Sequence, residues 1–403
     1  MKMRTLIGII CGVTIYILFI GGCEDRFDRG SLPNPTQVTN PGDTSYVEVF
    51  PPWGDFGSPS AVMIGNDQII YVCDYEKNEV VMLDAGGTVL TKRSIPHPVC
   101  IAQNSKLDLY VGGEAISPNG VDTIGAIYRI FLARFDTVYV AGYDTVIQFG
   151  DTIVTPVYRD TAYFANHHLD SAHTRIVWEE PGRPNRRFRG IGIMPDNGFL
   201  VARYGPDNSS FVDPDCRVLR FSATDTSDVF VTPIGDLITR GSGGTAISDI
   251  RYLTGIMIFP GTKNFLLTQK TDGVVYGAVI MTYTKNAIVD GWSPTYDPSD
   301  PATRGADIIR PYRFQNAVAA AYDKKRREIF VLDAALDSVM KFSNTGRFKQ
   351  ESFGRYITSS ENFPGLNSPM GIAFSNDCTL YIADTGNKVI RRFKLSIQTQ
   401  CTQ

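Results

Sequence analysis

Histidine side chains are the first candidates for chemistry in this chain, because imidazole moves protons near neutral pH and binds zinc. The four histidines are His97, His167, His168 and His173. The last three lie close together and, with Asp170, offer one way to chelate zinc, although a solvated loop is the simpler explanation. No Cys-x-x-Cys or Cys/His spacing of a metal site is present. We therefore assign no metal ligand from the sequence.

Three aspartates follow short apolar segments at equivalent places: Asp74, Asp333 and Asp384. A repeated carboxylate can serve acid–base catalysis, but after a strand it more simply accepts hydrogen bonds from the backbone of the next turn. We predict this structural role. No serine nucleophile elbow, Cys/His pair or phosphate-binding loop stands out either. We therefore assign no catalytic residue and do not favour an enzyme.

A cluster of arginines is the strongest basic feature: Arg183, Arg186, Arg187 and Arg189. Such a cluster can bind an acidic glycan or a phospholipid head group, or it can be a solvated face.

The start of the chain predicts export. Lys2 and Arg4 precede an uncharged apolar stretch, residues 5–20, which is typical of a signal peptide and short for a membrane span. Residues 23–43 hold prolines and small polar residues that exclude a core, so we expect a flexible tether.

The segment Ile20-Gly21-Gly22-Cys23 resembles the bacterial lipobox, whose cysteine thiol receives acyl chains such as palmitate. The resemblance implies a signal peptide over 1–22 and lipidation of Cys23. Glu24 after the cysteine favours the outer membrane over the inner one. An uncleaved signal anchor with an incidental cysteine is the alternative.

The composition is that of a soluble all-β protein. Without residues 1–22 the chain has 37 basic and 42 acidic residues, a formal charge of −5, which argues against nucleic acid as the partner. Many glycines and prolines punctuate short, aromatic-rich apolar runs, as in all-β folds. We expect a monomer.

Six copies of a two-strand pattern indicate an internal repeat. In each copy a strand that opens near a small residue is followed by a turn and a second apolar strand. These inner strands begin near Ser60, Pro98, Gly190, Gly255, Ala317 and Gly371. The continuous apolar character fits sheets that are covered on both faces, and small first residues allow a close approach to a crowded axis.

The last copy, residues 368–396, includes Gly-Ile-Ala-Phe and Leu-Tyr-Ile-Ala-Asp-Thr-Gly-Asn and closely resembles an NHL repeat. The resemblance implies an all-β fold, a six-bladed β-propeller over 44–397, with 398–403 as a C-terminal tail. A series of hairpins in a sandwich is the alternative. Because the last copy lacks a fourth strand, we expect the strand-like residues 45–50 to complete it and close the ring.

Blade spacing is uneven, which predicts long insertions between strands. In 134–180 the pair Asp-Thr recurs among alternating apolar and polar residues, so we expect a β-ribbon protruding from the second blade. Residues 222–250 and 284–312 are two further excursions. Loops this long in a compact domain are usually functional or disordered.

Five cysteines follow Cys23, and export permits disulfides between them. In a four-stranded meander the first and third turns lie at one end, which suggests the pairs Cys378–Cys401 and Cys73–Cys100. Cys216 has no obvious partner. Buried thiols throughout are the alternative.

The NHL resemblance also picks out the residue before each inner strand, which tends to lie at the mouth of the central channel. Here these residues are Ser60, His97, Arg189, Thr254, Asn316 and Met370. A mixed polar rim can bind a polar or anionic ligand, with Arg189 and His97 as donors, or it can be a hydrated funnel.

Related propellers suggest a metal site in the channel. Some lyases of this kind hold a metal with several channel histidines, and lactonases hold calcium with channel carboxylates and amides. Only His97 aligns with the first pattern. Only Asn316, supported weakly by Ser60 and Thr254, fits the second.

Two functions of different classes follow. The first is a lipid-anchored binding or scaffold module of the bacterial cell envelope that presents its rim and loops to a protein or glycan, with no cofactor. The alternative is a calcium- or zinc-dependent lyase or lactonase that uses the channel.

Overall fold

The computed structural model describes residues 46–132, 134–148, 151–163, 174–210, 212–223, 232–233, 244–354 and 365–396, with only the backbone described in 134–148, 151–163 and 232–233. Cys23, the tether, the C-terminal tail with Cys401, and the three clustered histidines lie outside these residues. Within the described part of the chain, no helix is long and apolar enough to span a membrane.

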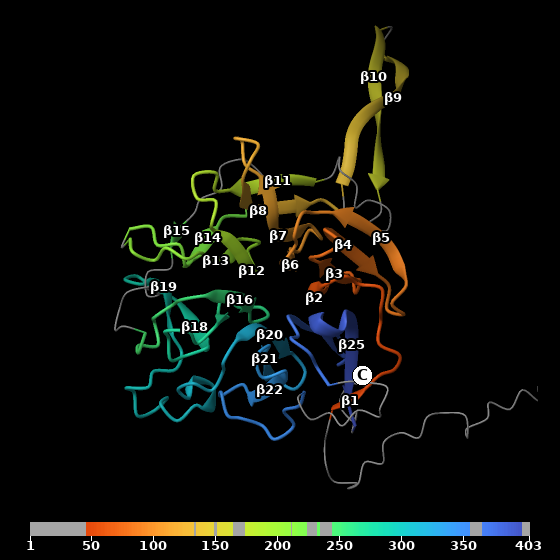
Figure 1. Ribbon diagram of the computed structural model, residues 1–403. Helices are drawn as coiled ribbons and strands as arrows, with labels where there is room; N and C mark the ends of the chain where they lie inside the picture. Colours follow the sequence, from red (N-terminus) through yellow and green to blue (C-terminus); the bar gives the residue numbers. More distant parts are fainter. Residues whose placement is uncertain are drawn as a thin grey trace, which may run out of the picture. The chain divides into compact units, whose positions relative to one another are not determined.

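Six antiparallel sheets form the blades of a β-propeller (Figure 1), which confirms the predicted fold. Blade one is β2 (Pro59–Ile64), β3 (Ile70–Asp74), β4 (Glu79–Leu83) and β5 (Val89–Ser94). Blade two is β6 (Cys100–Gln103), β7 (Leu109–Ile116), β8 (Thr123–Ile130) and β11 (Thr174–Glu179). Blade three is β12 (Arg187–Ile193), β13 (Phe199–Tyr204), β14 (Arg217–Phe221) and β15 (Thr232–Pro233).

The remaining blades complete the ring. Blade four is β16 (Leu253–Ile258), β17 (Phe265–Gln269), β18 (Ala278–Lys285) and β19 (Asp290–Pro294). Blade five is β20 (Ala317–Asp323), β21 (Glu328–Asp333) and β22 (Ser338–Ser343), and blade six is β23 (Gly371–Phe374), β24 (Leu380–Asp384), β25 (Val389–Leu395) and β1 (Tyr46–Glu48). Two short 3-10 helices, η4 (Asp307–Ile309) and η5 (Thr385–Asn387), lie in the connections.

The first strand closes the ring, as predicted. β1 pairs antiparallel with β25, so that Tyr46 lies opposite Leu395 and Glu48 opposite Phe393. The Arg391 guanidinium holds the Glu48 carboxylate, and both side chains are only 4% exposed. The last blade therefore takes its outer strand from the other end of the propeller sequence.

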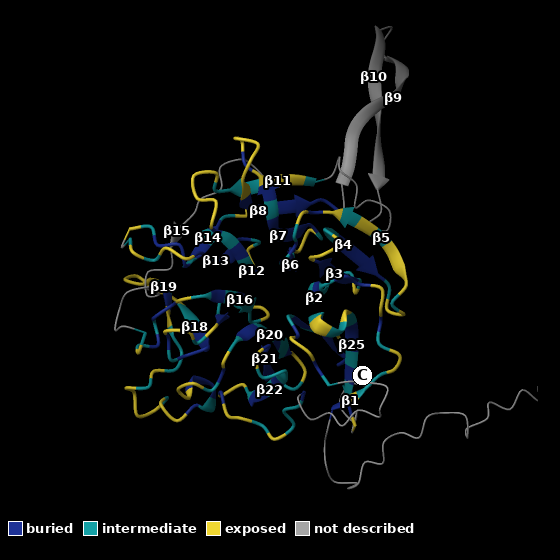
Figure 2. Cartoon of the chain, in the orientation of Figure 1, coloured by how far each residue is buried: buried dark blue, intermediate teal, exposed yellow. Residues whose placement is uncertain are grey.

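The core lies between neighbouring blades rather than in one central layer. Second strands such as β3, β21 and β24 are buried along their whole length (Figure 2). Glycines bring neighbouring inner strands close together: a Cβ on Gly190 would lie 2.5 Å from the Ile256 nitrogen, and one on Gly371 would lie 2.8 Å from the Ala61 Cα. The small residues at these inner-strand positions thus have the packing role that the sequence predicted.

A ribbon of two long strands, β9 (Arg134–Gln148) and β10 (Asp151–Tyr163), is inserted between β8 and β11 of blade two. The two strands pair only with each other among the described residues. Figure 1 shows them extending away from the blades. The excursion expected over 284–312 is shorter than predicted, because Asp290–Pro294 forms the outer strand of blade four.

The predicted Cys73–Cys100 disulfide is wrong, because both residues are free, buried thiols, as is Cys216. The Cys73 side chain packs in the core between blades one and two, whereas Cys100 packs between blades two and three, where its thiol contacts the Phe188 carbonyl. Burial raises the pKa of both thiols, that of Cys100 to about 12. Cys378 is disulfide-bonded, and because Cys401 lies outside the described residues, their pairing stays a prediction.

Candidate functional site: the central channel

The six inner strands surround a channel with a cavity volume of about 600 Å³. All inner strands are antiparallel to the second strands of their blades. Equivalent residues of neighbouring inner strands lie against each other, as Gly190 does against Gly255 and Gly371 against Ala61. The first residues of the inner strands therefore gather at one end of the channel, which we call the strand-start end, and their last residues at the strand-finish end. A cavity of this size is in the range of small-molecule pockets.

A β-bulge near the start of the inner strands determines which side chains face the channel at the strand-start end. The register of the first two strands shifts by one residue at Ser60, Arg189, Thr254 and Val318. In blade two Val99 donates its backbone N–H to Gly112, and in blade six Met370 donates to Ala383, at the equivalent position. A bulge leaves one residue unpaired and redirects its side chain, and all six residues line the channel.

The structure therefore places four predicted rim residues in the channel wall and two outside it. Ser60, Arg189, Thr254 and Met370 line the cavity, whereas His97 and Asn316 do not. The equivalent residues are Val99 and Val318, each two positions later in the sequence. The prediction misplaced both because Pro98 and Ala317 were taken as the first inner-strand residues, which ignored the bulge.

The hydroxyl groups at this end hold neighbouring blades together. Ser60 donates to the Pro98 carbonyl of blade two at 2.6 Å, and Thr254 donates to the Ala317 carbonyl of blade five. Thr385 donates to the Pro59 carbonyl of blade one at 2.6 Å. Since each hydroxyl has one proton, these three groups are committed as donors within the ring.

The aspartates at the ends of the second strands have the predicted structural role. Asp74 accepts hydrogen bonds from the backbone N–H groups of Gly57 and Ser58 at 2.7 and 2.8 Å. Asp333 accepts from four backbone N–H groups, two before its inner strand and two in the following turn. Both side chains are fully buried, so these carboxylates fix the strand-start end and are not part of the channel wall.

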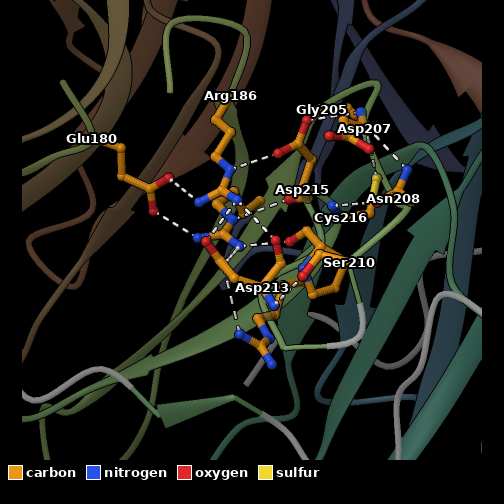
Figure 3. A network of polar contacts seen from close by, with 12 residues as sticks. Glu180, Arg186, Gly205, Asp207, Asn208, Ser210, Asp213, Asp215 and Cys216 are labelled. Carbon is orange, nitrogen blue, oxygen red and sulfur yellow. Dashed lines mark hydrogen bonds and ion pairs between the residues drawn. The ribbon is translucent and has the colours of Figure 1, made fainter. Parts of the chain in front are cut away.

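In blade three Arg203 stands in place of this aspartate and belongs to a largely buried ionic network, part of which Figure 3 shows. Arg203 donates to Glu180 at 2.7 Å and to Asp213 at 2.8 Å. Arg186 donates to Asp215, Asp213 and Glu180 at 2.7, 2.8 and 3.0 Å. Burial lowers the pKa of Arg186, but these carboxylates outweigh burial and raise it above its ordinary value.

The predicted arginine cluster thus separates into residues with different environments. Arg186 is buried and neutralised in the blade-three network. Arg187 donates to Glu114 at 2.8 Å. Arg189 lines the channel, where its guanidinium carbon lies 5.7 Å from the ring centre of Tyr204, and it makes no ion pair with a residue that the structure describes.

His97 does not line the cavity itself but contacts a residue that does. Its ring stacks on Tyr75, with ring centres 4.5 Å apart, and Tyr75 lines the channel. The His97 Nδ1 atom is 2.9 Å from Glu114 Oε2. Burial raises the pKa of Glu114, but hydrogen bonds with His97 and Arg187 outweigh it and lower the pKa below its ordinary value. His97 therefore positions Tyr75 instead of contacting the cavity.

The residues of the channel do not fit a calcium or zinc site. Of the residues that line the cavity within the described ranges, none is a carboxylate or a histidine, and the charged ones are Arg189 and Lys324. No group of three or more His, Cys, Asp or Glu side chains among the described residues is arranged to hold a metal. Calcium requires oxygen ligands and zinc requires nitrogen, sulfur or carboxylate ligands, so we derive no metal-dependent step.

The strand-finish end of the channel is mainly apolar, although Gln103, Tyr322 and Lys324 also border it, and sequence reasoning missed this. Partly buried side chains line it: Met63, Ile64, Ile193, Met257, Ile258 and Phe374. The signal was present in the apolar last residues of four inner strands, β2, β12, β16 and β23, but alternation alone does not show which of them face a channel.

No known family model matches this chain, and no curated protein matches it in sequence. Solved structures match its fold. An auxiliary nutrient binding protein from Bacteroides ovatus has a TM-score of 0.55 at 11% identity, over 88% of this chain and 78% of that one. One from Bacteroides thetaiotaomicron has a TM-score of 0.50 at 11% identity, over 85% and 70%. Regucalcin from Agrobacterium tumefaciens, a calcium-binding protein, has a TM-score of 0.50 at 10% identity, over 87% and 96%. At these identities the likeness concerns the fold alone.

Proposed function

We propose that this protein is a lipid-anchored binding module of a bacterial cell envelope, built from NHL-like repeats and attached through acylated Cys23. Its partner is a protein or a glycan of the envelope, and the β9–β10 ribbon is the element that reaches it. The neighbours in fold include proteins named for nutrient binding and for calcium binding, but at 10–11% identity they show the fold alone and decide no function.

The observation that carries the proposal is the ribbon. Twelve residue pairs join β9 and β10, yet no blade needs them, because β8 and β11 pair directly with each other through Ile130 and Thr174. An isolated two-stranded ribbon is marginally stable in water, so contact with a partner would stabilise it. Function in propellers is commonly found in such loops on a rigid scaffold.

The channel favours binding over catalysis for a different reason. Its described lining holds neither a carboxylate nor a histidine. These are the side chains that most often serve as general acid or base in catalysis. No observation favours the metal-dependent lyase or lactonase.

Deletion of the ribbon tests the proposal. Replacing 133–173 by Asn-Gly keeps the buried Phe131 and Leu132 and closes β8 onto β11 with a hairpin turn. We expect this variant to unfold at the same urea concentration as the intact protein, because the ribbon makes no sheet pairs with the blades. We also expect it to lose capture of envelope components.

Photo-crosslinking in cells identifies the partner directly. A photo-reactive phenylalanine at Tyr143 in β9 should give a discrete crosslinked product. The matched control is the same residue at Ile288, which is 93% exposed in blade four. Equal crosslinking from both positions would contradict a role of the ribbon.

The anchor has its own test. Cys23→Ala should block acylation and leave the chain unprocessed or released from membranes, as seen by fractionation and by mass spectrometry of the N-terminal peptide. Normal fractionation and an unmodified Cys23 in the intact protein would overturn the anchor, although not the role of the ribbon.

A further inference from the structure

The channel has a polar end and an apolar end, which its two sets of lining residues define. The strand-start end carries Ser58, Ser60, Tyr75, Arg189, Thr254 and Thr385. The strand-finish end carries the methionine, isoleucine and phenylalanine side chains described above, with Lys324 at its border and Gln103, whose amide is hydrogen-bonded to Asn66 and Asp67. Inner strands of four to seven residues rise ~3.3 Å per residue, so the two ends are ~13–23 Å apart. A ligand that spans the cavity would meet both environments.

The strand-start end has one charged side chain among its described lining residues, Arg189. Ser60, Thr254 and Thr385 donate their hydroxyl protons to blade carbonyls, so Arg189 is the strongest donor left to face the cavity. Its guanidinium is half-buried, contacts the Tyr204 ring and has no carboxylate partner among the residues that the structure describes. A guanidinium carries five N–H donors and pairs best with a carboxylate or a phosphate.

We propose that the channel binds one small amphipathic anion, with its carboxylate or phosphate group on Arg189 and its hydrocarbon chain toward Met257 and Phe374. Burial of the chain against the apolar end contributes the hydrophobic part of the affinity. The absence of described carboxylates from the wall removes repulsion of the acid group. This site goes beyond the proposed function, since the ribbon and the channel are different parts of the molecule.

Displacement of a fluorescent fatty acid tests the site. The protein is the chain from residue 24, which contains the whole closed ring and needs no detergent, and the probe is dansylated undecanoate. Dodecanoate and dodecyl phosphate carry the two candidate acid groups, and dodecanol carries neither. We expect at least one of the acids to displace the probe and dodecanol to do so about tenfold more weakly or worse, since a charge-assisted hydrogen bond is lost.

Substitution of the cation locates the acid group. Arg189→Gln should weaken the preferred acid about ten- to hundredfold and leave dodecanol unchanged, and Arg189→Lys should recover part of the loss. Lys324→Gln, at the opposite end, is the matched control and should change affinity less than twofold. Ala319→Leu narrows the cavity and should weaken acid and alcohol alike.

Three results would overturn the inference. They are a failure of every compound to displace the probe, equal affinity for acid and alcohol, and a loss in Lys324→Gln that exceeds the loss in Arg189→Gln. If Tyr143 gives no more crosslinking than Ile288 while the acids still displace the fluorescent probe, the proposed function alone is refuted. The two ideas therefore fail separately.

Discussion

Removal of the Glu48 carboxylate should open the ring at its closing strand. Arg391 Nε lies 2.8 Å from Glu48 Oε1, and a second guanidinium nitrogen contacts the other carboxylate oxygen. The Arg391 side chain is 4% exposed and keeps one further carboxylate, Asp384, at 3.2 Å. Breaking one side of a buried ion pair costs about 3–5 kcal/mol. Because Asp384 remains, we expect Glu48→Leu to lose about 3 kcal/mol of unfolding free energy.

Urea denaturation of the chain from residue 24 measures this loss. Trp53 reports on the closing strand, because its backbone N–H donates to the Ile390 carbonyl of β25 at 2.9 Å, and far-ultraviolet circular dichroism reports on all blades. The matched control is Glu79→Leu, which breaks a pair with Lys92, whose side chain is 41% exposed. Such a surface pair is worth about 0.2–1 kcal/mol.

A double variant makes the reasoning refutable. Arg391→Met in the Glu48→Leu background removes the buried guanidinium that has lost its Glu48 partner, whereas Asp384 still accepts hydrogen bonds from Asn367 and Asn387. The double variant should therefore recover part of the lost stability. Equal losses in Glu48→Leu and Glu79→Leu would show that the ion pair does not hold the ring closed. A double variant no more stable than Glu48→Leu would show that the buried Arg391 charge does not cause the loss of unfolding free energy in Glu48→Leu.

Two further perturbations follow from the fold. Gly190→Ala should cost about 1–3 kcal/mol, because its Cβ would lie 2.5 Å from the Ile256 nitrogen, whereas the control Gly182→Ala, with nothing within 4 Å, should be neutral in urea denaturation; equal midpoints would contradict the packing argument. Burial raises the pKa of Asp377, but hydrogen bonds from neighbouring hydroxyls and an ammonium group lower it from 3.8 to about 2. Its contribution to stability should therefore be fully present above about pH 4 and be lost as the pH falls through 2, so Asp377→Asn should flatten urea midpoints measured over this range. Asp55→Asn, whose side chain is 96% exposed, should leave the pH profile as it is.

The fold was largely predictable because the strands carry their own signals. Second strands such as Ile70–Asp74 and Leu380–Asp384 are apolar along their length because blades cover both faces, and an aspartate marks their ends. The closing strand was predictable because the strand-like residues 45–50, of which Tyr46–Glu48 forms the strand, had no other sheet to join. The outer strand Asp290–Pro294 was missed, because Asp-Gly-Trp-Ser-Pro has neither β-branched residues nor alternation.

The site was predictable only in part, because its register depends on a bulge. Arg189 was found since a glycine follows it, whereas Val99 and Val318 were displaced by two residues to His97 and Asn316. Four arginines close in sequence do not reveal that Arg189 makes no ion pair with a carboxylate among the described residues. This difference arises because carboxylates distant in the sequence, Glu114 and Asp215, reach Arg187 and Arg186 but not Arg189.

The closing strand also sets the order in which the chain can fold. Glu48 and Arg391 are separated by 343 positions, so β1 is synthesised long before its partner strand β25. Until then blade six is missing, and the blades on either side of the gap expose apolar faces that can associate with other chains. Bringing such distant segments together adds a loop-closure cost that slows folding. The polypeptide must therefore avoid aggregation until its last strand is present, and ring closure is the final step of its folding.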